Sequence, residues 1–224
     1  MAIHEWPKDE QPREKLLNHG PQTLSNAELL AIFLRTGTAN QNAIELGRTL
    51  LHEFGGLSAL LGSSNEQFCQ HHGVGQATYA QLQAALELGK RYLSEEIAND
   101  EVLLNPKRTR RYLASQLRHY PHEVFACLYL DNQHRLIRFK KLFHGTVNQA
   151  SVYPREVVKQ ALQYNASAVI FAHNHPSGDA NPSEADISLT QRLKEALATI
   201  DIRVLDHIVV GAGHTASVAE QGLI

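Results

Sequence analysis

Two histidines and one carboxylate in the last quarter of the chain have the spacing of a metal site. His173 and His175 are two residues apart at the end of an apolar run, and Asp186 follows eleven residues after the second histidine. Alternate side chains of a strand lie on one face, so the two imidazoles can bind one cation. Two neutral imidazoles and a carboxylate suit Zn²⁺, and a fourth position left to water distinguishes a catalytic site from a structural one. The spacing therefore predicts a catalytic zinc site.

The residues between the second histidine and the carboxylate predict a turn followed by a new helix. Pro176 ends the strand, and Ser183 has the spacing of a helix N-cap with Asp186 as the acidic third residue. Capping alone explains Ser183 and Asp186 without any metal, and an isolated His-x-His pair is typical of ordinary histidines. The two interpretations are compatible, because a capped first turn would hold Asp186 in place.

Two regions of different character position this loop. The N-terminal region predicts helices at 27–35, 43–54, 66–71 and 77–93. The C-terminal region alternates helices at 108–118, 154–164 and 183–198 with strands at 124–130, 135–143, 168–172 and 204–210. An acidic stretch over residues 94–106 separates the two regions. We therefore expect a mixed α/β chain with an all-helical module over residues 1–95 and a sheet domain over residues 102–224.

The metal loop also resembles a known family. His173-x-His175-Pro176, six further residues and Ser183-x-x-Asp186 match the JAMM motif of the MPN+ metalloproteases. The sequence His-Asn-His-Pro-Ser-Gly-Asp is similar to that of RadC, a bacterial branch of this family with a DNA repair label. Further similar stretches cover residues 13–17, 34–37, 154–159 and 205–210, so the resemblance extends over almost the whole chain.

The resemblance implies a fold, a reaction and roles for individual residues. It implies a JAMM/MPN, cytidine-deaminase-like mixed sheet with one zinc ion per chain, bound by His173, His175 and Asp186. It further implies hydrolysis of a peptide or isopeptide bond in a protein or peptide substrate. Glu156 would then act as general acid and base, and Ser183 would stabilise the oxyanion.

A second hypothesis is a DNA-associated protein in which the zinc domain serves for docking. Gly73-Val74-Gly75, between a short and a long helix, resembles the turn of a helix-hairpin-helix motif, which offers backbone N–H groups to a phosphate. The charge opposes tight binding, since residues 1–100 contain 7 Lys+Arg and 12 Asp+Glu, a net charge of −5. A turn that only packs two helices together is the alternative interpretation. The basic run at residues 107–111 also has two interpretations. It could contact nucleic acid or an acidic partner, or it could be a solvated face.

Composition narrows the remaining function classes. The net charge of −2 predicts no general attraction to nucleic acid or acidic membranes, and no apolar run is long enough to span a bilayer. The N-terminal residues lack the features of a signal peptide, so we expect a cytoplasmic protein. A zinc deaminase would need a Cys-x-x-Cys pair, which the sequence lacks. His207, at the start of an apolar strand, is interpreted as a core residue, with a position behind the metal ligands as the alternative.

Overall fold

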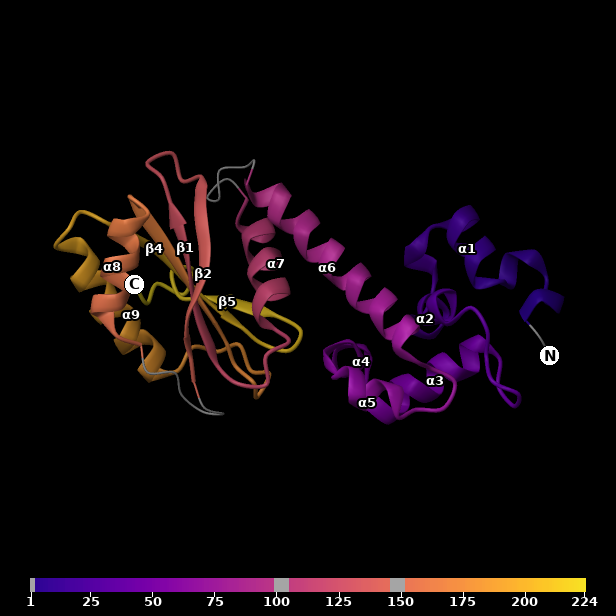
Figure 1. Cartoon of the computed structure of the whole chain (residues 1–224). Helices are drawn as coiled ribbons and strands as arrows, with labels where there is room; N and C mark the ends of the chain where they lie inside the picture. Colours follow the sequence, from indigo (N-terminus) through magenta and orange to yellow (C-terminus); the bar gives the residue numbers. More distant parts are fainter. Residues whose placement is uncertain (1–2, 99–104, 146–151) are drawn as a thin grey trace. The chain divides into compact units, whose positions relative to one another are not determined.

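The computed structural model describes residues 3–98, 105–145 and 152–224, which form helices and one five-stranded sheet (Figure 1). The chain divides into two compact units, the first ending at Gly89 and the second beginning at Lys90. The predicted class, a helical module followed by a mixed α/β domain, is confirmed. No helix within the described ranges is both long and apolar enough to cross a membrane.

The first unit is built from short helices around one apolar core. The helices are α1 Pro12–His19, α2 Asn26–Leu34, α3 Ala43–Phe54, α4 Leu57–Gly62 and α5 Asn65–Cys69, followed by the start of α6 Gln76–Ala98. Capping boxes begin α2, α3 and α5, with N-caps Ser25, Asn42 and Ser64. These boxes explain why the starts of these helices were predictable. Helices α1 and α4 were not predicted, and α1 buries only Pro12 and so lacks an apolar stripe.

Helix α6 is longer at its C-terminal end than the sequence predicted. It continues to Ala98, beyond the predicted end at Leu93 and into the stretch predicted to separate the domains. Leu93 and Ile97, four residues apart, pack into a core cluster of the second unit, which keeps this end helical. Residues 99–104, in the middle of the predicted boundary, lie outside the described residues, and helix α7 Pro106–Leu117 begins at the last residue of that boundary.

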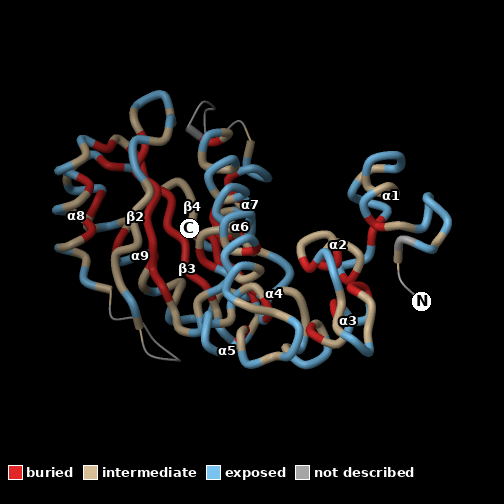
Figure 2. Tube along the Cα trace, turned by 45° about the vertical axis from the view of Figure 1, so that its right-hand side comes forward, coloured by how far each residue is buried: buried red, intermediate tan, exposed pale blue. Residues whose placement is uncertain are grey.

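The second unit contains a mixed sheet in the order β2-β1-β3-β4-β5. The strands are β1 Val124–Leu130, β2 Leu136–His144, β3 Ala168–Asn174, β4 Arg203–Val210 and β5 Thr215–Ser217. Only β3 and β4 pair in parallel; the other neighbours are antiparallel. Every residue of β1 and β3 is buried, and these two strands form the red centre of the sheet in Figure 2. The three-residue strand β5 was not predicted, because three residues are too few to show an alternation of polar and apolar side chains.

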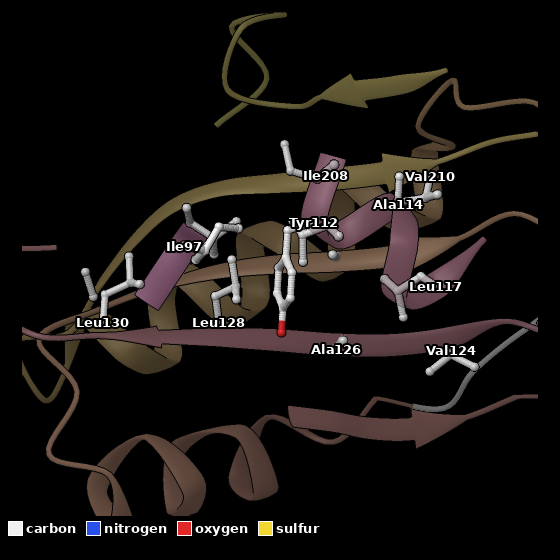
Figure 3. Close-up of a cluster of buried hydrophobic side chains, with 14 residues drawn as sticks. Ile97, Tyr112, Ala114, Leu117, Val124, Ala126, Leu128, Leu130, Ile208 and Val210 are labelled. Atoms are coloured by element: carbon white, nitrogen blue, oxygen red, sulfur yellow. The ribbon is translucent and has the colours of Figure 1, made fainter. Parts of the chain in front are cut away.

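Helices cover both faces of this sheet. Helix α7 Pro106–Leu117 lies on one face, while α8 Pro154–Gln163 and α9 Glu184–Ala198 lie on the other (Figure 1). Figure 3 shows the α7 side, where Tyr112 and Leu117 of α7 meet Ala126 and Leu128 of β1. The odd-numbered residues of β1, from Phe125 to Tyr129, pack with α8 and α9 instead. His173, two residues after Phe171 in β3, therefore belongs to the α8/α9 face.

Candidate metal centre

Three side chains from neighbouring segments converge on one point in the second unit. His173 lies at the end of β3, His175 directly follows that strand, and Asp186 lies in the first turn of α9. The Nε2 atoms of the two histidines are 2.9 Å apart. The Oδ1 atom of Asp186 lies 3.3 Å from Nε2 of His173, and its Oδ2 atom lies 3.4 Å from Nε2 of His175. The structure thus brings together the three residues that the sequence spacing singled out.

The arrangement of these three donors fits a tetrahedral metal ion. Two ligand atoms that each lie about 2.0–2.1 Å from zinc are about 3.3 Å apart in a tetrahedral site. The two Nε2 atoms are 2.9 Å apart, and each has one carboxylate oxygen of Asp186 at 3.3 or 3.4 Å, so these separations lie within a few tenths of an ångström of that value. Over residues 3–98, 105–145 and 152–224, this is the one group of three or more histidine, cysteine or acidic residues close enough together to hold a metal.

Each histidine uses its second ring nitrogen to fix its orientation. Nδ1 of His175 lies 2.8 Å from the carbonyl oxygen of Asp179, which can only accept a hydrogen bond. Nδ1 of His175 therefore carries the proton, and in the neutral ring Nε2 keeps a lone pair for a metal. The backbone N–H of His175 donates to the carbonyl of Val210, so the segment after β3 stays tied to β4.

Behind His173 lies a buried chain of hydrogen bonds that returns to the helix of Asp186. Nδ1 of His173 is 2.8 Å from Nε2 of His207, and Nδ1 of His207 is 2.6 Å from the hydroxyl of Thr190. That hydroxyl donates to the backbone carbonyl of Asp186 at 2.6 Å. His207 and Thr190 are fully buried. These hydrogen bonds connect His173 to Asp186 through His207 and Thr190, which are not themselves candidate metal ligands.

The direction of this hydrogen-bond chain shows which ring nitrogen of His173 donates to His207. The single proton of the Thr190 hydroxyl goes to the Asp186 carbonyl, so Nδ1 of His207 must donate to Thr190. Burial, and next the nearby His173, hold the pKa of His207 well below its usual range, so the ring is neutral and its Nε2 accepts. His173 then donates from Nδ1, so in the neutral ring its Nε2 atom keeps a lone pair for a metal and faces the other two donors.

Ser183 and Asp186 form a capping box at the start of α9. The N–H and the hydroxyl of Ser183 donate to Oδ2 of Asp186 at 2.7 and 2.6 Å, and Oγ of Ser183 accepts the Asp186 N–H at 3.2 Å. Burial opposes ionisation of Asp186, but the close imidazoles of His173 and His175, and then the hydroxyl of Ser183, hold its pKa well below its usual range. Asp186 therefore completes the capping box and also faces the histidines, so the predicted metal role is compatible with the cap.

The residue between the two histidines anchors the end of β3. The side chain of Asn174 is buried, accepts the N–H of Val124 at 2.9 Å and donates to the carbonyls of Tyr120 and His122. These bonds tie the end of β3 to the segment that leads into β1. Asn174 thereby limits movement of the histidines on either side of it.

Comparison with known proteins agrees with this geometry. The family description "RadC-like JAB domain" matches residues 103–223, and "UPF0758 N-terminal" matches residues 3–80. A UPF0758 protein of Nitrosococcus oceani is 60% identical over 224 residues, which is all of both chains. UPF0758 proteins of Marinomonas sp. strain MWYL1 and Aeromonas hydrophila are 58% and 60% identical, over at least 99% of each chain. The chain belongs to the UPF0758 family of RadC-like proteins. The predicted resemblance to RadC is thereby confirmed.

In this UPF0758 protein Glu156 lies on a neighbouring helix and is paired with a residue other than the three converging side chains. It is the third residue of α8, the helix that packs beside α9, and its side chain is 45% exposed. Its ion-pair partner is the neighbouring Arg155, with Nε 3.7 Å from Oε1. Among the described residues, no hydrogen bond or ion pair joins Glu156 to His173, His175 or Asp186. The role of Glu156 in proton transfer therefore stays a prediction.

The Gly73–Val74–Gly75 turn joins α5 to α6 and packs within the first unit. Gly73 has φ +92°, and a Cβ atom there would lie 2.5 Å from Cγ2 of Thr38. A side chain at Gly73 would therefore disturb the turn whether or not the turn contacts DNA. A Cβ atom at Gly75 would meet nothing within 4 Å, so Gly75 is the better position at which to test the predicted DNA contact.

The preferred sequence interpretation of His207 was incomplete. His207 is a buried core residue, as expected, but both ring nitrogens are bonded and one of them contacts His173. The position behind the metal candidates, given as the alternative, describes it better. The sequence around His207 does not indicate this role. Its partner Thr190 follows Asp186 by four residues and so lies on the same helix face, which is the one local sign of the hydrogen-bond chain.

Proposed function

We propose that this UPF0758 protein is a zinc-dependent hydrolase that cleaves peptide or isopeptide bonds. The observation that carries the proposal is the convergence of His173, His175 and Asp186, with the second ring nitrogen of each histidine already bonded. A structural zinc site would need a fourth protein ligand, and no fourth donor joins this group among the described residues. Three protein donors with one open position are the arrangement of a hydrolytic site.

The chemistry of the reaction would be shared between the metal and nearby side chains. Zinc in this site would lower the pKa of a water molecule towards about 7, which supplies hydroxide at neutral pH. Glu156 would accept the proton of the attacking water and deliver it to the leaving amine as the C–N bond breaks. Glu156 is suited to exchange protons with solvent because its side chain is half-exposed in the first turn of α8.

Ser183 already donates two hydrogen bonds within the capping box. Its hydroxyl proton is donated to Asp186 at 2.6 Å, so its first role is to hold that carboxylate. To stabilise an oxyanion, the hydroxyl would have to turn from Asp186 towards the substrate carbonyl. The cap would retain the bond from the Ser183 N–H to Asp186 during this rotation.

The proposal is tested by the products that the zinc-loaded protein forms. We would incubate the wild type, Glu156→Gln and the control Glu184→Gln with a peptide library and with a cell extract, and identify new termini by mass spectrometry. Glu184 is an exposed glutamate in the first turn of α9 and so matches Glu156 in type and position. We expect new termini from the wild type and Glu184→Gln, and none from Glu156→Gln or after chelation.

Two outcomes would contradict the proposal. Identical termini from the wild type and Glu156→Gln would remove Glu156 from the chemistry. Absence of new termini from the zinc-loaded wild type in both mixtures would remove the peptidase activity, while the metal site itself would stand.

A further inference from the structure

The first unit contains a cavity that is separate from the metal centre. Its volume is about 990 Å³, and it lies among α1, the end of α2 and the beginning of α3. Arg13, Arg35, Thr36, Thr38 and Gln41 contribute to its lining. All of these residues precede Gly89, so the cavity belongs to one compact unit. Its size is at the upper end of the range of about 300–1,000 Å³ typical of small-molecule sites.

One wall of the cavity is a strained loop that follows α2. Arg35 has φ +62° and ψ −52°, and the Thr36 N–H donates to the Leu34 carbonyl at 2.7 Å. This is a γ-turn with positive φ, a conformation that non-glycine residues rarely adopt. A β-carbon at Gly37 would lie 1.8 Å from the carbonyl oxygen of Gln41, so the loop is folded tightly on itself. Strain of this kind is concentrated at binding sites, where it places side chains for a ligand.

The cavity gathers positive charge in a unit that is otherwise acidic. Residues 1–89 contain five lysines and arginines and nine aspartates and glutamates, a formal net charge of −4. Two of the five cationic residues, Arg13 and Arg35, line this one cavity. Lys15, by contrast, is paired with Glu28 at 2.8 Å. Neither arginine has an ion-pair partner in the part of the chain that the structure describes.

Glu45, the acidic residue in the cavity lining, already accepts a hydrogen bond. Glu45 accepts the backbone N–H of Asn42 through Oε2 at 2.8 Å, as part of the capping box of α3. Thr38 offers a hydroxyl at the same wall, and its Oγ1 accepts the N–H of Asn40 at 3.4 Å. Its hydroxyl proton therefore remains able to donate to a ligand. The lining thus presents two guanidinium groups and hydroxyl donors against one carboxylate held in the cap, a net positive set that suits an anion with several oxygens.

We propose that this cavity binds a small molecule that carries phosphate groups. The fork of N–H donors on each arginine matches phosphate oxygens, and charge-assisted bonds of this type are strong. A nucleic acid strand fits the site less well, because the acidic surface of the unit would repel an extended polyanion. Arg13 and Arg35 would bind the phosphate groups, and Thr38 would donate a further hydrogen bond.

Calorimetric titration of the full-length chain with ATP, and separately with inorganic pyrophosphate, tests this proposal. We expect binding of at least one probe by the wild type, with affinity reduced at least about tenfold in Arg13→Gln and in Arg35→Gln. The control is Arg48→Gln, an exposed arginine of α3 outside the cavity lining, which should change the affinity less than about twofold. Thermal unfolding of each variant checks that the fold is retained. If Arg35→Gln fails to fold, the affinity of Arg13→Gln, a substitution at an exposed residue of α1, is the test of the proposal.

Four results would overturn the proposal. The first is no binding of either probe at millimolar concentration. The second is equal loss of affinity in Arg48→Gln, which would indicate general electrostatic attraction. The third is loss of binding in Asp186→Ala, which would place the phosphate at the metal centre. Preferential binding of a 12-nucleotide single-stranded DNA, with the same dependence on Arg13 and Arg35, would assign the cavity to nucleic acid instead.

Discussion

Helices α2 and α9 begin with the same hydrogen bonds, yet their capping carboxylates meet different partners. In α2, the N–H and hydroxyl of Ser25 donate to Oε2 of Glu28, both at 2.7 Å. In α9, the same groups of Ser183 donate to Oδ2 of Asp186, at 2.7 and 2.6 Å. The other oxygen of Glu28 binds Lys15 at 2.8 Å, whereas that of Asp186 faces His173 at 3.3 Å.

The comparison separates what a local motif does from what its surroundings add. Both boxes satisfy N–H groups at a helix start, which is a local stabilising role. Only at α9 does the sheet place two imidazoles opposite the capping carboxylate. The same motif therefore stabilises a helix in the first unit and positions a metal ligand in the second.

Removal of the two carboxylates should give the largest difference. Asp186→Ala removes one of three metal donors, so zinc content after dialysis should fall from about one per chain to at most about a tenth of that. Glu28→Ala removes a matching cap far from the histidines in sequence and should leave zinc content unchanged. Elemental analysis of the purified proteins measures both. Zinc retained at the wild-type level by Asp186→Ala would remove Asp186 from the ligand set.

Interruption of the buried hydrogen-bond chain should weaken zinc binding less than removal of Asp186 does. Thr190→Val removes the acceptor for Nδ1–H of His207, so His207 can instead donate to His173 and move a proton to its metal-facing nitrogen. Zinc affinity, measured by competition with a chelating dye, should fall about 10–100-fold. Thr190→Ser should restore it, because the hydroxyl returns.

The matched control for this hydrogen-bond chain is Thr199, the C-cap residue of the same helix. Thr199→Val alters an exposed hydroxyl that donates to the Ala196 carbonyl at the end of α9. It should leave zinc affinity unchanged. If Thr190→Val also bound zinc like the wild type, the protonation of His173 would not depend on the chain.

Replacement of the two N-cap serines compares the boxes directly. Ser25→Ala and Ser183→Ala should each lower the free energy of unfolding by about 1 kcal/mol, measured by urea denaturation. Only Ser183→Ala should also lower zinc affinity, since Ser183 holds the carboxylate that faces the histidines. An equal loss of zinc affinity in Ser25→Ala would contradict the distinction between the boxes.

The smallest expected effect concerns pH and the Glu28 box. Burial opposes ionisation of Glu28, but the bonds from Lys15 and Ser25 lower its pKa to about 2. Its stabilising contribution is therefore fully present above about pH 4.5 and is lost as the pH falls towards 2. Glu28→Gln should lower stability at neutral pH by about 1 kcal/mol or less. The difference from the wild type should vanish near pH 2; a difference that persists there would contradict the assigned pKa.

The sequence was sufficient for the parts of the site that depend on local patterns. Strand alternation predicted that His173 and His175 share a face, and the capping box predicted Asp186 in the first turn of a helix. Both patterns act over a few residues, where backbone geometry leaves few alternatives. The helix starts at Asn26 and Ala43 were predictable for the same reason, because each follows a capping residue.

The parts that were missed depend on packing between distant segments. His207 contacts His173 because β4 pairs in parallel with β3, and the sequence around His207 shows only an apolar strand. The strained turn at Arg35 likewise follows from the closure of its loop against Gln41, which no propensity indicates. Tertiary contacts decide both features, so periodicity and spacing gave no sign of them.

The most direct test of the central claim is anomalous diffraction at the zinc edge from crystals of the zinc-loaded protein. The account predicts one strong peak per chain, about 2.0–2.2 Å from Nε2 of His173, Nε2 of His175 and a carboxylate oxygen of Asp186. His122 and His144, whose ring nitrogens lie 3.3 Å apart, offer an exposed rival pair. A peak at that pair, or no peak beside His173, would contradict the assignment of the metal centre.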